Sequence, residues 1–170
     1  MDWVVFIQLF VSVLFLVSAA SKLSKPSSFM NTLRQLRIPP FRARRAAVII
    51  PLAELAACGL LLFPATLVYG AAFGLLLLSS YVWAVWRAKG RMVSYEWFGG
   101  LLSEKFGSGL YIRHAVLFGM MIYLLAAPAF HAPKLASFTE ISSMVLSSLG
   151  IMILYALVLT LWQYHKLYRE

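Results

Sequence analysis

Five long apolar runs, separated by short polar stretches, dominate the chain; they cover residues 3–20, 46–63, 67–86, 110–127 and 144–164. Each is close to the roughly 20 residues that an α-helix needs to cross a hydrocarbon core of about 30 Å. Strands of a membrane barrel would alternate polar and apolar residues, and the runs show no such alternation. The pattern predicts an all-α integral membrane protein, a five-transmembrane-helix bundle forming one domain over residues 1–170.

The first run is predicted to remain in the protein as a spanning helix. Only Met1 and Asp2 precede it, so the basic start of a signal peptide is missing. The run is also longer than the about 7–15 apolar residues of a signal-peptide core. We therefore expect residues 3–20 to form the first of the five crossings.

The connections between the runs differ in character. Residues 64–66 allow only a tight hairpin, and Pro64 ends the helix before them. Residues 27–38 follow Pro26 and gather their apolar side chains on one helical face, which predicts a short amphipathic helix in the cytoplasmic headgroup layer. The cytoplasmic-side loop 87–109 contains aromatic residues and glycines, and we expect it to pack against the bundle.

Composition and charge agree with the membrane assignment. Hydrophobic residues make up 62% and charged residues 12% of the chain, and the mean hydropathy is +0.83; soluble proteins are about 45–50% apolar and about 25% charged. The formal net charge of +9 does not indicate nucleic-acid binding, because the basic residues flank the apolar runs. All Lys and Arg residues except Lys134 lie in the stretches 21–45, 87–113 and 165–170. The positive-inside rule therefore places the N-terminus outside and the C-terminus in the cytoplasm, which requires an odd number of crossings.

Glu54 is the carboxylate at the middle of the second run. A charge at that depth costs at least roughly 2.5–3.5 kcal/mol on insertion scales, so it needs a partner or a function. The candidate partners are Lys22, at the cytoplasmic end of the first run, and Arg113, at that end of the fourth. Two interpretations stay open: a carboxylate that handles a proton or a ligand, and a buried ion pair that fixes how the helices register.

Two further residues could belong to such a site. Cys58 follows Glu54 by four residues and lies on the same helical face. It is the chain's one cysteine, so it is either a small packing residue or a thiol that reacts with an external cysteine. His114 follows Arg113. Together they either anchor the helix at the interface or bind an anionic headgroup, a quinone oxygen or Glu54.

Four fragments, in this order, resemble the MauE branch of the DoxX-like membrane proteins, over roughly residues 5–165; they are Ala20-Ser21-Lys22-Leu23, Pro51-Leu52-Ala53-Glu54-Leu55-Ala56, Trp97-Phe98-Gly99-Gly100 and Ile112-Arg113-His114. The resemblance implies a small helical bundle in a bacterial cytoplasmic membrane. It also implies a link to the maturation of methylamine dehydrogenase through disulfide chemistry in the periplasm. Other relatives are linked to quinone-coupled or thiol redox systems.

The chain departs from this family at a pair of cysteines. Many MauE-like proteins carry a Cys-x-Cys-Phe-Gly stretch, and position by position Tyr95 and Trp97 stand where the cysteines would be. Two thiols are needed to cycle between dithiol and disulfide. The resemblance therefore implies the architecture, and thiol exchange within one chain is excluded.

Two main functional hypotheses follow. The first is a non-catalytic accessory or maturation subunit that works by assembly with a membrane or extracytoplasmic protein. In this hypothesis the chain is a multi-pass membrane protein that needs no cofactor, metal or nucleic acid. The second is a small-molecule site for a quinone, a lipid or a proton, formed by Glu54, Arg113 and His114. A thiol redox enzyme that uses Cys58 with an external cysteine is the third hypothesis. It ranks last because one buried thiol is a poor exchanger.

Overall fold

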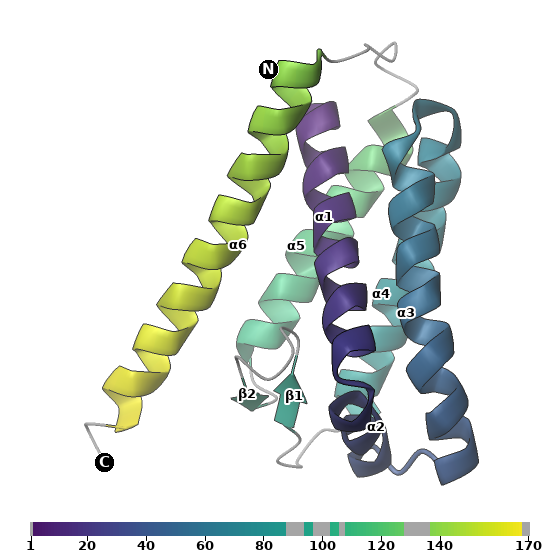
Figure 1. Ribbon diagram of the computed structural model, residues 1–170, viewed down its shortest axis with the longest axis vertical. Helices are drawn as coiled ribbons and strands as arrows, with labels where there is room; N and C mark the ends of the chain where they lie inside the picture. The colour runs from purple at the N-terminus through teal and green to yellow at the C-terminus, as the bar shows by residue number, and fades with distance from the viewer. Residues whose placement is uncertain (1, 88–93, 97–102, 106–107, 128–136, 168–170) are drawn as a thin grey trace.

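A computed structural model describes residues 2–87, 94–96, 103–105, 108–127 and 137–167 (Figure 1). The helices are α1 (Trp3–Ser24), α2 (Pro26–Gln35), α3 (Pro40–Leu62), the 3-10 turn η1 (Pro64–Thr66), α4 (Leu67–Arg87), α5 (Ser108–Ala126) and α6 (Phe138–Leu167). Two short strands, β1 (Ser94–Glu96) and β2 (Ser103–Lys105), pair antiparallel. The chain is thus an all-α membrane protein with one small strand pair in the connection predicted as a loop.

Four segments within the described residues are long and apolar enough to cross a membrane; they are Trp3–Ser24, Pro40–Leu62, Pro64–Ala84 and Phe138–Val158. The described part of α5 contributes a shorter apolar segment, Ile112–Ala126. A fifth crossing by α5 therefore stays a prediction, as does the orientation of the bundle in the membrane.

The helix α1 lies at the centre of the arrangement and packs against α3, α5 and α6, while α4 packs against both α3 and α5. The helix α6 lies alongside α1 at the edge of the bundle, and α2 lies across one end (Figure 1). The start of α1 and the end of α6 are at opposite ends of the molecule (Figure 1). Large buried side chains from the central helices, among them Phe15, Leu61, Leu78 and Met121, fill the core.

Two helices begin six residues earlier than the apolar pattern predicts. Pro40 begins α3 at a position where its missing N–H costs nothing, so the arginines that follow are helical rather than part of a loop. Ser137 precedes α6 and forms a capping box with Glu140, in which the Ser137 N–H donates to the Glu140 carboxylate at 2.9 Å. Polar first turns extend both helices, and hydropathy alone does not detect them.

The amphipathic helix predicted over residues 27–38 is present as α2, and its placement in the headgroup layer stays a prediction. Its apolar face packs against α3, where Leu33 is buried with Ala43 and Ala47. The helix ends in a Schellman motif: Arg37 has a left-handed φ of 58°, and the Ile38 N–H donates to the Leu33 carbonyl at 3.2 Å.

The hairpin between α3 and α4 is fixed by side chains that satisfy the last carbonyls of α3. The Thr66 hydroxyl donates to the Leu60 carbonyl at 2.7 Å, and the buried Gln8 amide of α1 donates to the Leu61 carbonyl at 2.5 Å. The α4 backbone approaches this end directly, since a Cβ added at Gly70 would lie 2.8 Å from the Leu61 nitrogen. These contacts hold α1, α3 and α4 together at the end opposite α2.

Candidate functional site

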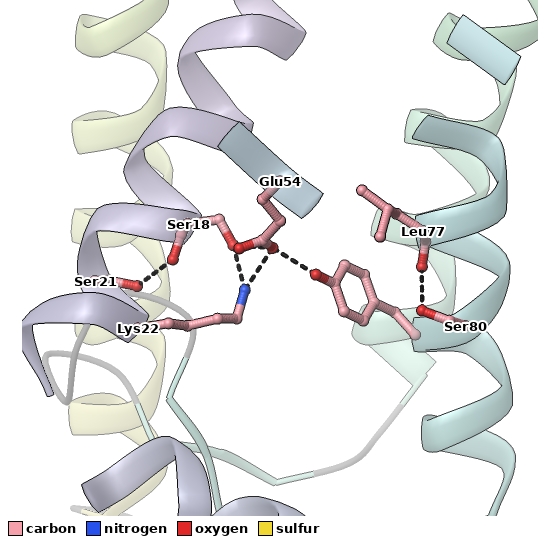
Figure 2. A network of polar contacts seen from close by, with 7 residues as sticks. Ser18, Ser21, Lys22, Glu54, Leu77 and Ser80 are labelled. Carbon is pink, nitrogen blue, oxygen red and sulfur yellow. Dashed lines mark hydrogen bonds and ion pairs between the residues drawn. The ribbon is translucent and has the colours of Figure 1, made fainter. Parts of the chain in front are cut away.

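Three helices bring polar side chains together around Glu54. Ser18 and Lys22 are four residues apart near the end of α1 and therefore share a face. Glu54 lies on α3 one turn after Pro51, and Tyr81 lies on α4. Figure 2 shows the side chains of Ser18 and Lys22 reaching from α1 toward the Glu54 carboxylate.

One oxygen of the Glu54 carboxylate accepts hydrogen bonds from all three of these side chains. Glu54 Oε1 accepts hydrogen bonds from Lys22 Nζ at 2.5 Å, from Tyr81 Oη at 2.5 Å and from Ser18 Oγ at 2.8 Å (Figure 2). Lys22 Nζ also donates to Ser18 Oγ at 2.6 Å. We call Glu54, Lys22, Ser18 and Tyr81 the Glu54 cluster.

The Glu54 cluster is removed from solvent. The relative exposure of the side chain is 2% for Lys22 and 0% for Glu54. The Lys22 ammonium lies 5.3 Å from the Tyr81 ring centroid and 5.6 Å from that of Phe29, which belongs to α2. Two opposite charges therefore compensate each other in a medium where either alone would be costly, and charge-assisted hydrogen bonds strengthen the pair.

The second carboxylate oxygen has a different environment. Glu54 Oε2 is buried and accepts no hydrogen bond from any residue that the structure describes. A buried carboxylate oxygen has acceptor capacity for more than one hydrogen bond. The Glu54 cluster can therefore hold a charge pair with its Oε1 side and accept a further donor on its Oε2 side.

Arg113 and His114 lie on α5, outside the Glu54 cluster. His114 is buried with a relative exposure of 2%, and Arg113 is half-buried. The Glu54 carboxylate contacts Ser18 and Lys22 of α1 and Tyr81 of α4. Of the two cations that the sequence offers as partners, the structure therefore pairs Lys22 with Glu54.

Cys58 lies one turn beyond Glu54 in the apolar core. Its relative exposure is 7%, and it belongs to the buried cluster that includes Ala57 and Leu61. The loop motif Trp97, Phe98, Gly99 and Gly100 lies outside the described residues. The preceding strand β1 packs against α2, which places the start of this connection beside the end of the bundle where α2 lies.

The sequence pattern does not single out Tyr81 as a member of the site. Its hydroxyl lies within an apolar run, and its relative exposure is 8%. A buried tyrosine hydroxyl normally has a hydrogen-bond partner, and this was the available signal. Which buried acceptor it reaches depends on how α4 packs against α3, and the sequence does not show this.

Comparison with protein-family models gives a match to "Methylamine utilisation protein MauE" over residues 1–127. The match includes α1 to α5 and the whole Glu54 cluster, and α6 lies beyond it. Comparisons with curated proteins and with solved structures give no significant match.

Proposed function

The chain belongs to the family of methylamine utilisation protein MauE, and we propose that it is a non-catalytic accessory subunit. It works by assembly with a membrane or extracytoplasmic protein that takes part in maturing the methylamine-oxidising enzyme. The bundle crosses the cytoplasmic membrane five times, with its N-terminus outside. The basic stretches at one side and the placement of the two chain ends at opposite ends of the molecule support this orientation (Figure 1).

The proposal is supported by how the chain's one cysteine and the buried Glu54 carboxylate are placed. One cysteine cannot cycle between dithiol and disulfide within a chain, and this cysteine lies in the apolar core. Glu54 is engaged by Lys22, Ser18 and Tyr81, which ties α3 to α1 and α4. Both groups fit a scaffold, and they favour a contribution to assembly over a reaction performed by this chain.

The proposal predicts a stable partner. The full chain with a C-terminal tag, expressed at native level in its own host and extracted in a mild detergent, should co-purify with a second protein from the methylamine utilisation system. Cells lacking the chain should contain less active methylamine-oxidising enzyme, and the tagged chain should restore it. A similarly expressed, unrelated multi-pass protein with the same tag provides the control.

Two results would contradict this proposal. One is a chain that restores the enzyme fully yet is recovered as a monomer under several mild extraction conditions and after crosslinking in intact cells. The other is a purified chain that alone carries out the maturation chemistry.

A second candidate function is a small-molecule site for a quinone, a lipid or a proton at Glu54. The buried Oε2 atom favours it, because this oxygen accepts no hydrogen bond from the described part of the chain. A ligand hydroxyl or a transferred proton would satisfy that oxygen while Lys22 balances the charge. This candidate requires a carboxylate at position 54 for activity even in a variant that folds normally.

A further inference from the structure

The chain has an uninterrupted basic segment at the end of the bundle where α2 lies. Between Asp2 and Glu54 it contains no acidic residue. Lys22 is buried in the Glu54 cluster, whereas Arg34 of α2 and the arginines in the first turns of α3 are exposed. The helix α2 packs against α3, so these arginines gather at one end of the molecule (Figure 1). We define the three on α3, Arg42, Arg44 and Arg45, as the arginine cluster.

The arginine cluster adjoins a surface that suits lipid tails. One to two turns further along α3, Val48, Ile49 and Leu52 are each more than half exposed. In a membrane this apolar strip faces hydrocarbon, so the arginines before it lie near the level where hydrocarbon gives way to headgroups. Side chains on a helix tilt toward its N-terminus, and long cationic side chains can therefore extend from α3 into the headgroup layer.

Aromatic side chains accompany the arginines on two neighbouring helices. The Arg45 guanidinium lies 4.1 Å from the ring centroid of Phe41, which is 66% exposed. On α4 the Arg87 guanidinium lies 5.3 Å from the ring centroid of Trp83, which is 51% exposed. Both pairs have the aromatic residue four positions before the arginine, and they lie at the same end of the bundle (Figure 1). Aromatic rings and cations at one level are typical of a membrane interface.

The start of α3 adds to the positive potential. Its N-cap residue is Pro39, which provides no side-chain hydrogen bond to the first turn. The first backbone N–H groups and the positive end of the helix dipole therefore point toward the same region as the arginine cluster. Guanidinium groups bind phosphate with two parallel hydrogen bonds. A zwitterionic headgroup carries a compensating positive charge beside its phosphate, so an anionic headgroup suits the arginines better.

We propose that the arginine cluster, with Phe41 and the start of α3, binds the headgroup of an anionic phospholipid. The acyl chains of that lipid lie along the exposed apolar strip of α3, which a free phosphate ion could not use. The inference is independent of the accessory function, because it concerns the outer surface of the bundle and not its partner or the Glu54 cluster.

The test measures lipid binding to the purified full chain in uncharged detergent micelles. Energy transfer from tryptophan to dansyl-labelled phosphatidylglycerol gives the affinity, and the same label on phosphatidylcholine gives the reference. We expect phosphatidylglycerol to bind at least about tenfold more tightly, since each basic residue at an anionic surface contributes about 1 kcal/mol, or about fivefold in affinity. The preference should fall as sodium chloride is raised.

A triple variant, Arg42→Gln/Arg44→Gln/Arg45→Gln, should lose at least about tenfold of this preference. The matched control, Arg42→Lys/Arg44→Lys/Arg45→Lys, retains the charge and should retain most of it. Equal binding of the two lipids by the wild type would overturn the proposal, as would an undiminished preference in the folded Gln variant. Displacement of phosphatidylglycerol by millimolar inorganic phosphate, at constant ionic strength, would also overturn it because the site would then be selective for the anion alone.

Discussion

Glu54 and Lys22 each depend on the other to be stable inside the bundle. Each is a charged side chain in a segment that is otherwise apolar, and each is tolerated because the other lies 2.5 Å away. Removing one partner of a buried pair leaves an uncompensated charge, which is far worse than replacing both. Ser18 and Tyr81 add neutral donors to the same oxygen and so orient the carboxylate.

We therefore expect Glu54→Gln alone to destabilise the protein by roughly 3–5 kcal/mol, because it leaves the Lys22 ammonium buried without a counter-charge. The double variant Lys22→Met/Glu54→Gln should recover much of that loss. Thermal unfolding and monodisperse yield in one detergent provide the comparison. A single variant as stable as the wild type would show that the pair is not structurally important.

At the scale of elements, close contact between α4 and the end of α3 depends on a residue without a side chain. A Cβ at Gly70 would lie 2.8 Å from the Leu61 nitrogen and 2.9 Å from the Leu60 carbonyl carbon, and backbone atoms cannot move aside cheaply. At Gly119, on α5, a Cβ would meet no atom within 4 Å beyond the adjacent backbone of its own helix. Close packing of α4 against α3 therefore requires a glycine at position 70, whereas the packing of α5 does not require one at position 119.

This contrast predicts opposite signs for the same substitution. Gly70→Ala should lower the stability by about 1–3 kcal/mol, as overpacking does. Gly119→Ala should leave it unchanged or raise it by up to about 1 kcal/mol, because alanine favours the helix. Unfolding temperatures measured side by side in the same detergent check the prediction, and a Gly70→Ala protein as stable as Gly119→Ala would refute the close α3–α4 contact.

For the whole molecule, the apolar pattern was sufficient to predict the helical membrane fold, the hairpin at Pro64 and a short helix after the first run. It missed the polar first turns of α3 and α6, because those turns depend on Pro40 and on the Ser137–Glu140 capping box rather than on hydropathy. It predicted the apolar face of α2 but not the element that covers it, which is α3.

The Glu54 cluster was predictable only in part. The cost of an isolated carboxylate in a membrane identified Glu54, and position along the helices limited its partners to Lys22 and Arg113. The choice of Lys22 depends on α1 packing directly against α3, and the participation of Tyr81 depends on the rotation of α4. Such relations between helices arise from side-chain packing across the whole bundle, which one sequence does not specify.

The central claim is that the Glu54 cluster supports a scaffold and performs no reaction. Growth of the host on methylamine with the charge-neutral double variant Lys22→Met/Glu54→Gln tests it most directly, once its folded yield in the membrane matches that of the wild type. We expect growth and partner co-purification to persist, because neither needs the carboxylate itself. Loss of growth in a variant that folds and still binds its partner would contradict the claim and establish Glu54 as a working acid.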